Sequence, residues 1–315
     1  MKILVFGSGG IGSVFGGFLA RMGHEVSLLG RPWHMDAIEK EGLVITGLWG
    51  DYRIKAFELH RSVQEIYEKK PEFDLILLTV KSFDTRQAVG ELLPLMNQNT
   101  TLVSFQNGLG NIEIILEKVK PEQFLVGRVI FGAECEPGRV RVTVSADKII
   151  IGALPGVTPK LSAHTVAHLF NLSKLETQAV PNILTYIWSK VIYNCALNGI
   201  CTIFEMPYGN ILLKEDTREW MKAIVRECYA VGTKKGVALD PLTPEAYIEQ
   251  LIKKLIPSTA SHIPSMLQDI RKKKPIDIDA LNGAICRMGE FFGVPTPENQ
   301  RVVDAILTKA KKLDK

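Results

Sequence analysis

A glycine-rich segment near the start of the chain constrains the fold more than any other feature of the sequence. The run GSGGIG at 7–12 matches the pattern G-x-G-x-x-G and directly follows the apolar run KILVF at 2–6. A helical pattern continues from there to about Met22. A strand, this loop and a helix begin a βαβ unit that binds a dinucleotide, because N–H groups at the helix N-terminus attract phosphate.

Each glycine of the loop has an expected role in such a unit. Gly7 permits the tight turn, Gly9 lets the backbone approach a pyrophosphate, and Gly12 allows the helix to pack closely on the strand. A glycine-rich turn without a ligand is the alternative interpretation. The loop residues that we expect to contact the cofactor are Gly7, Ser8, Gly9, Gly10, Ile11 and Gly12.

The first half of the chain alternates β-branched runs with helical patterns, which is typical of a parallel sheet built from βαβ units. Two longer segments, 43–59 and 140–154, each predict a hairpin. We expect the first hairpin to be added to the sheet and the second to turn at Ser145–Asp147. The other expected strands are 2–6, 25–29, 73–80, 101–105 and 124–133.

The pattern changes from about Pro181 onward, where helical periodicity with proline breaks replaces the strand pattern. A chain of 315 residues is also long for one core. We therefore predict an α/β fold class, with a Rossmann-type NADPH-binding domain over 1–179 and an all-helical substrate and catalytic domain over 180–315. A cleft between such domains is a usual place for a ligand.

Composition and charge exclude several other classes of protein. The formal net charge of +4 is slight for this length, so nucleic-acid binding is not expected. The five cysteines include no CxxC pair, which disfavours a disulfide framework or zinc knuckle and favours the cytoplasm. His164 and His168 have zinc-ligand spacing but lack the glutamate of a metalloprotease motif, so no metal site is expected. The apolar segment 186–204 carries Lys190 and two asparagines, so we expect no membrane span.

Polar side chains follow three of the expected strands, at the edge of the sheet where ligands bind. Arg31 follows the second strand, where no acidic residue stands, and a guanidinium suits the 2′-phosphate of NADPH better than the 2′-hydroxyl of NADH. Lys81 and Asn107 each follow a later strand and are placed to meet the cofactor. A solvent-facing arginine and an ordinary Asn-Gly turn are the alternatives.

The segment WSKVIYNCALNG at 188–199 carries Lys190, Asn194 and Asn198 at intervals of four residues. These positions form one stripe on a helix whose other faces are apolar. A buried amide without a partner costs roughly several kcal/mol and a buried ammonium at least as much, so the stripe requires a partner in the protein or a ligand. One interpretation is a lysine that reaches solvent and asparagines that bond to nearby backbone, and the other is a ligand site.

Together these motifs resemble those of the ketopantoate reductase family (2-dehydropantoate 2-reductase). The resemblance extends from Lys2 to about Glu290, and the separate motifs occur in the family's order. They are GSGGIG at 7–12, Arg31, VK at 80–81, QNG at 106–108, the K-x3-N-x3-N helix at 190–198, SMLQD at 265–269 and DIDALNG at 277–283.

The resemblance implies NADPH as the cofactor and ketopantoate, a small 2-oxoacid, as the substrate, in the biosynthesis of pantothenate and coenzyme A. By matching position it implies that Lys190 is the general acid and that Asn194, Asn198 and Ser265 bind the substrate. It also implies that the strand-end lysine and asparagine contact the cofactor or the active site. The chemistry agrees, because hydride reduction of a ketone builds negative charge on its oxygen and requires a proton donor there. A homodimer is left open as the assembly state.

Three positions depart from the family's pattern. Asp277, which we expect to bind the substrate, stands where the family usually has glutamate, and its carboxylate is shorter by one methylene. His262 and Tyr208 stand where the family often has asparagine. Because all three changes concern the substrate side, another branched or bulky 2-oxoacid is the first alternative substrate. A non-catalytic NADPH-binding regulator and a β-hydroxyacid dehydrogenase are the further alternatives.

Overall fold

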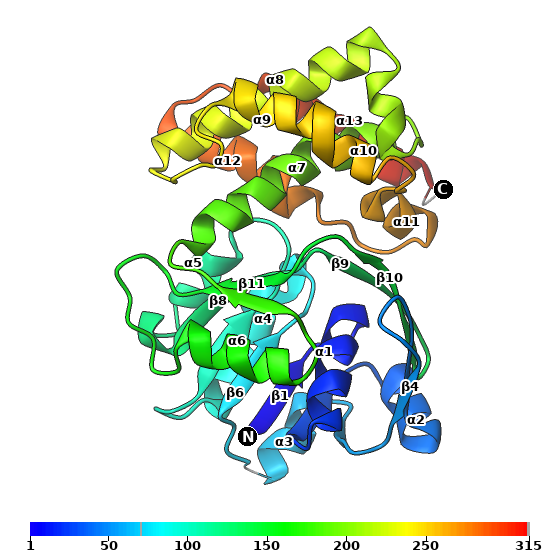
Figure 1. Cartoon of the computed structure of the whole chain (residues 1–315), viewed down its shortest axis with the longest axis vertical. Coiled ribbons are helices and arrows are strands. Elements are labelled where there is room, and N and C mark those ends of the chain that lie inside the picture. Colours follow the sequence, from blue (N-terminus) through cyan, green and yellow to red (C-terminus); the bar gives the residue numbers. More distant parts are fainter. Residues whose placement is uncertain (70, 314–315) are drawn as a thin grey trace. The chain divides into compact units, whose positions relative to one another are not determined.

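Residues 1–69 and 71–313 are described by the structure, which is a computed structural model. The chain divides into two units, each described by itself (Figure 1). The first comprises Met1–Gln106 and Asn111–Ile183, and the second comprises Asn107–Gly110 and the chain from Leu184 onward. This division lies just after the boundary that we expected between residues 179 and 180. The sequence did not indicate that the short segment Asn107–Gly110 would belong with the helices.

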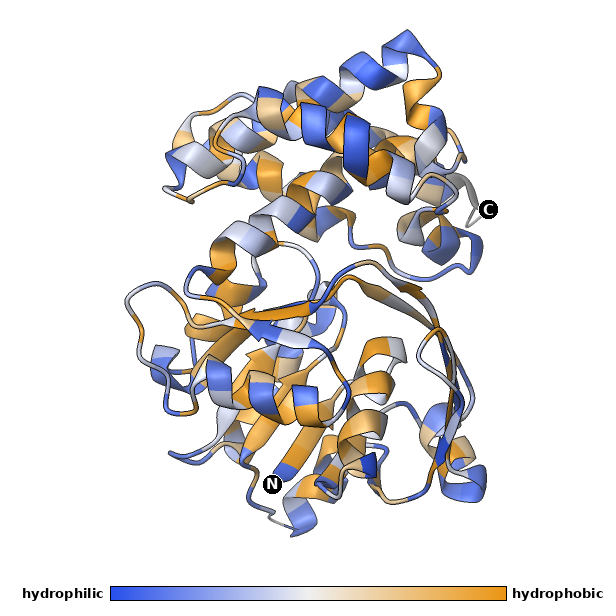
Figure 2. Ribbon diagram, in the orientation of Figure 1, coloured by the Kyte–Doolittle hydropathy of each residue, from blue (hydrophilic) through white to orange (hydrophobic). Residues whose placement is uncertain are grey.

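The first unit contains an eight-stranded sheet among the described residues, and this arrangement confirms the predicted α/β fold class. All neighbouring strands run parallel except β8 and β11. Runs such as LILL in β6 are buried on both faces, as expected of a parallel sheet covered by helices (Figure 2). In order across the sheet, the strands are β12 (Thr177–Ala179), β11 (Ile149–Gly152), β8 (Phe124–Arg128), β7 (Thr101–Ser104), β6 (Leu75–Leu78), β1 (Lys2–Phe6), β2 (Glu25–Leu29) and β5 (Glu58–His60).

A second, four-stranded sheet in the described part of the first unit packs against α1 (Gly10–Arg21). Two glycines of α1 permit this packing. A Cβ on Gly16 would lie 2.5 Å from Leu28 of the main sheet, and a Cβ on Gly17 would lie 2.5 Å from Ile45 of the second sheet. The helix is therefore enclosed between the two sheets. In order, the strands of the second sheet are β4 (Tyr52–Ile54), β3 (Leu43–Gly47), β10 (Arg139–Ser145) and β9 (Phe131–Glu136).

The second sheet corrects several expectations from the sequence. Segment 43–59 does form a hairpin, β3 and β4, but this hairpin lies in the second sheet, and only β5 joins the main sheet, beside β2. The prediction of a hairpin over 140–154 is wrong. Strand β10 pairs with β9 and β3, whereas β11 pairs with β8 and β12. The single strand expected at 124–133 is two strands, β8 and β9, in different sheets. Apolar alternation identifies a strand and its buried face but not its neighbours.

The other helices of the first unit lie around the main sheet (Figure 1). One of them, α6, contacts β11 and β12, and the short strand β12 was not predicted from the sequence. These helices are α2 (Pro32–Glu41), α3 (Val63–Lys69), α4 (Thr85–Leu92), α5 (Asn111–Leu116) and α6 (Ala163–Leu172).

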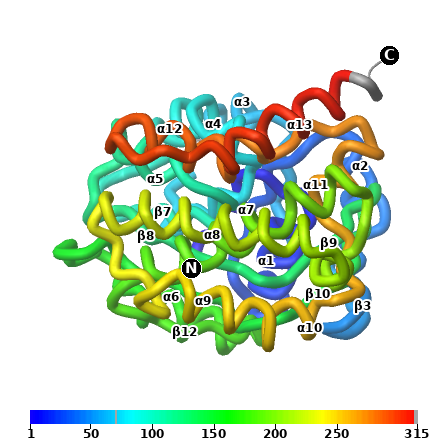
Figure 3. Tube along the Cα trace, turned by 90° about the horizontal axis from the view of Figure 1, so that it is seen from above, coloured from blue at the N-terminus to red at the C-terminus, as the bar shows by residue number. Residues whose placement is uncertain are grey.

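The second unit is helical throughout its described elements and begins with α7 (Ile183–Ile203), which carries the predicted polar stripe. Helix α8 contacts α9, α12 and α13 (Figure 3). A π-helical stretch at Leu251–Leu255 joins α9 to α10. Over the described residues, no helix has the length and apolar character that would carry it across a membrane. The remaining helices are α8 (Glu215–Lys234), α9 (Pro244–Gln250), α10 (Ile256–Ser258), α11 (Ser265–Arg271), α12 (Asn282–Phe292) and α13 (Pro297–Leu313).

A buried histidine at the end of β5 makes the stability of the first unit sensitive to pH. His60 is fully buried, and neither of its ring nitrogens has a hydrogen-bond partner in the described structure. The nearest carboxylate oxygen, on Glu58, lies 3.8 Å from its Nε2 atom. Burial lowers the pKa of His60 from the ordinary value of 6.5 despite this carboxylate. Protonating this imidazole therefore favours the unfolded state.

We expect the melting temperature to fall as the pH is lowered through about 6.5, because the unfolded chain then binds a proton that buried His60 resists. Each unit of pKa difference contributes about 1.4 kcal/mol. Replacing the imidazole in His60→Leu should make the dependence of melting temperature on pH shallower between pH 7 and pH 5. The matched control is His164→Leu at an exposed position. An unchanged slope in His60→Leu would contradict the assignment.

Candidate active site

Packing within the protein accounts for two of the three motif glycines. Gly7 has a φ of +105°, and a Cβ there would lie 2.6 Å from the side chain of Val80. A Cβ on Gly12 would lie 2.6 Å from the carbonyl oxygen of Gly7. The loop is fastened at both sides, since the hydroxyl of Thr79 donates to the Gly7 carbonyl at 2.8 Å and the N–H of Ser8 donates to Leu29 at 2.8 Å. These glycines therefore fix the shape of the turn.

The protein itself gives no reason for the third motif glycine. A Cβ on Gly9 would meet no protein atom within 4 Å, and its φ of −82° suits any residue. Beside it, Ser8 is only 4% exposed, and its hydroxyl has no hydrogen-bond partner among the described residues. Helix α1 begins at Gly10, so its first N–H groups have no partner inside the helix. Open space, an unpartnered hydroxyl and a helix N-terminus together fit a phosphate group, so these residues fit a dinucleotide cofactor.

Two cations stand at strand ends of the first unit, as the sequence indicated. Arg31 is exposed and directly precedes α2, and Lys81 is exposed and precedes a 3-10 turn at Ser82–Asp84. The Lys81 turn is supported by Gln106, whose side-chain amide donates to the Val80 carbonyl at 3.2 Å. The sequence placed Gln106 beside the site, but gave no indication that it buttresses this turn.

The Gly9 position offers a direct test of the cofactor site. We expect Gly9→Ala to leave the melting temperature unchanged or slightly raised, because the space is open and alanine loses less backbone entropy than glycine. The added methyl should nevertheless lower the affinity for a nicotinamide dinucleotide by about tenfold or more, equivalent to ~1.4 kcal/mol. Both quantities can be measured by thermal unfolding and by titration of the cofactor.

The control for Gly9→Ala is Gly90→Ala in α4, where a Cβ also meets nothing within 4 Å. This variant should retain both stability and cofactor affinity. Equal affinity for NADH and NADPH in Gly9→Ala and in the unmodified protein would show that the loop is only a turn.

The two asparagines predicted to bind the substrate each contact another predicted site residue, Asn107 or Ser265. The side-chain amide of Asn194 lies 3.3 Å from the Oδ1 atom of Asn107. The amide of Asn198 donates to the Ser265 hydroxyl at 3.3 Å, and its oxygen accepts the N–H of Met266 at 3.4 Å. Asn198 is 2% exposed, so the partner that the sequence required for it is the start of α11.

Lys190 lies one turn before Asn194 on α7 and is half-buried. The other faces of the helix are enclosed, since Val191, Ile192 and Cys195 are 1% exposed or less. Lys190 is thus held on an ordered, largely buried helix, in line with the two asparagines.

The Asn107 loop is fastened to the segment that carries Asp277. The N–H of Leu109 donates to the carbonyl of Ala280 at 2.8 Å. Gly108 has a φ of +85°, and a Cβ there would lie 2.4 Å from that carbonyl oxygen, so only glycine permits this approach. Asp277 is half-buried and directly precedes the 3-10 turn Ile278–Ala280. This contact explains why the loop belongs with the helical unit.

Two of the positions that depart from the family's pattern are in contact with each other. The ring centroids of Tyr208 and His262 are 5.0 Å apart, and the N–H of Tyr208 donates to the His262 carbonyl at 3.1 Å. Tyr193, next to Asn194, extends this aromatic group, with its ring 5.8 Å from that of Tyr208. Burial lowers the pKa of His262 and raises the pKa of Tyr208 well above its ordinary value, so neutral forms of both are favoured near pH 7.

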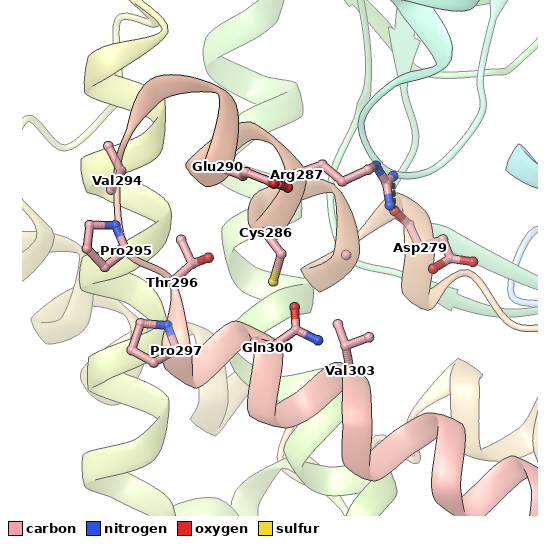
Figure 4. A pocket seen from close by; sticks show the side chains of 11 residues that line it. Asp279, Cys286, Arg287, Glu290, Val294, Pro295, Thr296, Pro297, Gln300 and Val303 are labelled. Carbon is pink, nitrogen blue, oxygen red and sulfur yellow. Dashed lines mark hydrogen bonds between the residues drawn. The ribbon is translucent and has the colours of Figure 1, made fainter.

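A cavity of about 460 Å³ opens elsewhere in the second unit, between α12 and α13 (Figure 4). Asp279, Cys286, Arg287 and Thr296 are among its lining residues, and Arg287 donates to the Asp279 carbonyl at 2.7 Å. The described lining includes none of the predicted site residues. The cavity is therefore separate from the candidate active site.

The fold is a Rossmann-like dinucleotide-binding domain followed by a helical domain, and comparison with known proteins assigns it to a family of nicotinamide dinucleotide-dependent reductases. The model of the family described as ketopantoate reductase PanE/ApbA matches residues 3–156, and that of the C-terminal part of the same family matches residues 182–310. The chain therefore belongs to the ketopantoate reductase family, which confirms the resemblance seen in the sequence.

Relatives named 2-dehydropantoate 2-reductase match this chain over nearly their whole length. The 2-dehydropantoate 2-reductase of Aquifex aeolicus is 34% identical over 314 residues, which cover 99% of this chain and 97% of the relative. That of Pyrococcus abyssi is 32% identical over 300 residues, which cover 95% and 94% respectively.

Two solved structures illustrate the range of proteins with this fold. A PanE/ApbA family ketopantoate reductase from Ralstonia eutropha superimposes with a TM-score of 0.88 at 28% identity, with 100% of both chains covered. D-mandelate dehydrogenase bound to NADH and anilino(oxo)acetate superimposes with a TM-score of 0.89, also at 28% identity, and covers 100% of this chain and 99% of its own.

Proposed function

We propose that this protein reduces 2-dehydropantoate (ketopantoate) to pantoate with NADPH, a step in the biosynthesis of pantothenate and coenzyme A. The observation that carries this proposal is the polar stripe of α7, on which Lys190 precedes two asparagines held by Asn107 and Ser265. Relatives named 2-dehydropantoate 2-reductase support the choice of substrate. The free cysteines support a cytoplasmic location, because thiols stay reduced there.

Arg31 supports the choice of NADPH over NADH. It stands exposed after β2, where an NAD-binding unit usually carries an acidic residue for the ribose hydroxyl. A guanidinium there would hold a 2′-phosphate by two charge-assisted hydrogen bonds. The glycine loop would hold the pyrophosphate, and Lys81 would contact the cofactor from the end of β6.

Each residue of the second unit has a distinct part in the proposed reaction. When bound, NADPH supplies the hydride. Lys190 donates a proton to the carbonyl oxygen of the substrate as negative charge develops there. Asn194 holds a polar group of the substrate without adding charge, and Asn198 acts on the substrate through the Ser265 hydroxyl that it holds. Ser265 and Asp277 complete the substrate contacts, through a hydroxyl and a carboxylate.

Removing the proton donor should abolish turnover but not cofactor binding. We expect Lys190→Ala to lower kcat with ketopantoate by about 10²- to 10⁴-fold, the usual contribution of a general acid. Its dissociation constant for NADPH should stay unchanged, because the glycine loop and Arg31 lie in the other unit. Steady-state NADPH oxidation and cofactor titration measure the two effects. Lys254→Ala, at an exposed position on the same unit, is the control; normal turnover by Lys190→Ala would refute the mechanism.

Removing the guanidinium should change the cofactor preference. In Arg31→Ala, kcat/KM for NADPH should fall by about tenfold or more, because charge-assisted bonds to the 2′-phosphate contribute about 1.5–3 kcal/mol. The value for NADH should change little. Arg141→Ala, an exposed arginine on β10, provides the comparison. If Arg31→Ala lost activity equally with both cofactors, Arg31 would not be the determinant.

A different 2-oxoacid is the second candidate substrate, and the contact between Tyr208 and His262 favours it. These rings stand where the family often has asparagine, and they offer fewer hydrogen bonds to the hydroxyl of ketopantoate than two amides would. D-mandelate dehydrogenase, which resembles this chain in fold, was solved with the aromatic ligand anilino(oxo)acetate. Rates with ketopantoate, 2-oxoisovalerate and phenylglyoxylate at equal concentration decide between the two candidates, since the preferred substrate should have the highest kcat/KM.

A further inference from the structure

A buried asparagine outside the predicted site connects three helices of the second unit. Asn282 is the first residue of α12 and is fully buried. Its Nδ2 atom donates to the carbonyl of Cys195 in α7 at 3.2 Å and to the Oδ1 atom of Asn299 in α13 at 2.9 Å. Its two side-chain N–H groups thus bond α12 to α7 and to α13.

A carboxylate fixes the direction of this hydrogen-bond chain. Glu227 of α8 accepts the N–H groups of Glu298 and Asn299 at 2.8 and 2.9 Å, so it caps the N-terminus of α13. It also accepts the side-chain N–H of Asn299 at 2.7 Å. An ionised carboxylate only accepts, so the Asn299 amide turns its NH₂ toward Glu227 and its oxygen toward Asn282. Asn282 must then donate to both of its partners.

This polar contact leaves one buried oxygen without a hydrogen bond from the described part of the chain, which lowers the free energy of unfolding; an apolar contact would not have this effect. The Oδ1 atom of Asn282 is buried and has no hydrogen-bond partner in the described structure. An unsatisfied buried oxygen of this kind is uncommon in folded proteins. Close packing accompanies it, since a Cβ on Gly199 of α7 would lie 2.3 Å from Val302 of α13. Helices α12 and α13 thus hold α7 by one hydrogen bond and one close approach, a turn apart along its length. Elsewhere on α7 the Ser189 carbonyl accepts from the Tyr247 hydroxyl at 2.9 Å.

These contacts act directly beside the polar stripe. Cys195 and Gly199 each directly follow one of the stripe asparagines in the sequence. The carbonyl of Ala280, two residues before Asn282, accepts the N–H of Leu109 from the Asn107 loop. The short segment 280–282 therefore fastens both α7 and the loop, whose asparagines approach to 3.3 Å.

We propose that Asn282 is a positioning residue for the reaction: it fixes the rotation of α7 about its axis and thereby the alignment of Lys190, Asn194 and Asn198. The inference rests on the proposed function. Rotating a helix moves all side chains of one stripe together, so the bond to the Cys195 carbonyl acts on three functional groups at once. This bond lies between the bonds at Ser189 and Asn198 along the same helix. Glu227 and Asn299 act through Asn282 by fixing the direction of its donors.

The variant Asn282→Leu tests the proposal, because leucine has a similar volume but donates no hydrogen bond. We expect kcat with ketopantoate to fall by about ten- to a hundredfold, since small misplacements of catalytic groups have effects of that size. The KM for ketopantoate should rise and the dissociation constant for NADPH should not change. Amide hydrogen exchange over residues 190–200 should become faster.

Ile306→Val provides the control for a general loss of stability. Ile306 is fully buried in α13 and makes none of these polar contacts, and its truncation should lower the melting temperature by about 2–4 °C. This variant should retain kcat and normal exchange in α7. Equal losses of kcat in the two variants at equal melting temperature would overturn the proposal, because Asn282 would then contribute only to stability.

A second variant keeps the test decisive if Asn282→Leu folds poorly. Glu227→Gln places an NH₂ group where the carboxylate accepted, so it should lower kcat in the same direction but by less. Combining it with Asn282→Leu should add little further loss, as expected of residues in one network. Independent, additive losses would contradict the proposal. An unmodified protein that reduces no 2-oxoacid would instead refute the proposed function, while hydrogen exchange would still report on the hold of Asn282 on α7.

Discussion

An enclosed helix that carries an ammonium and two amides must supply each of them with a partner, and the second unit is organised around this requirement. Asn198 meets the start of α11, and Asn194 meets the loop that follows β7. That loop belongs with the helices, where the Leu109 N–H also bonds to the Ala280 carbonyl. The groups that bond to these asparagines are themselves polar and can also bond to a polar ligand. The need to pair buried polar groups therefore brings together the residues of the proposed site.

The glycine loop shows how structural and functional glycines can be separated by the space around them. Gly7 and Gly12 are required by neighbouring protein atoms, so they would be needed even in a protein without a cofactor. Gly9 has no such neighbour, and Ser8 beside it has a buried hydroxyl without a partner. Within the described residues, open space at Gly9, a buried unpartnered hydroxyl at Ser8 and the N-terminus of α1 together fit a bound phosphate.

The sequence predicted the central strands and the helical second unit well, because a buried parallel strand reads as a continuous apolar run and a helix reads as a 3.6-residue period. The sequence did not predict which strands pair with each other. Segment 140–154 has the alternation of two strands, but nothing in it reveals that α1 separates the sheets to which they belong. The candidate site likewise contains features that the sequence predicted and features that it did not. Lys190 and its two asparagines were visible as a periodic stripe, whereas the contact of Tyr208 with His262, and the network of Asn282, join residues distant in the chain.

The central claim is that a 2-oxoacid held by the α7 stripe receives hydride from NADPH and a proton from Lys190. Incubation with ketopantoate and NADPH deuterated at the transferred position of the nicotinamide ring tests it most directly, with the product examined by mass spectrometry and NMR. We predict that deuterium appears at C2 of pantoate, in step with NADPH oxidation. NADPH oxidation without deuterated pantoate, or no oxidation with any 2-oxoacid, would contradict the account.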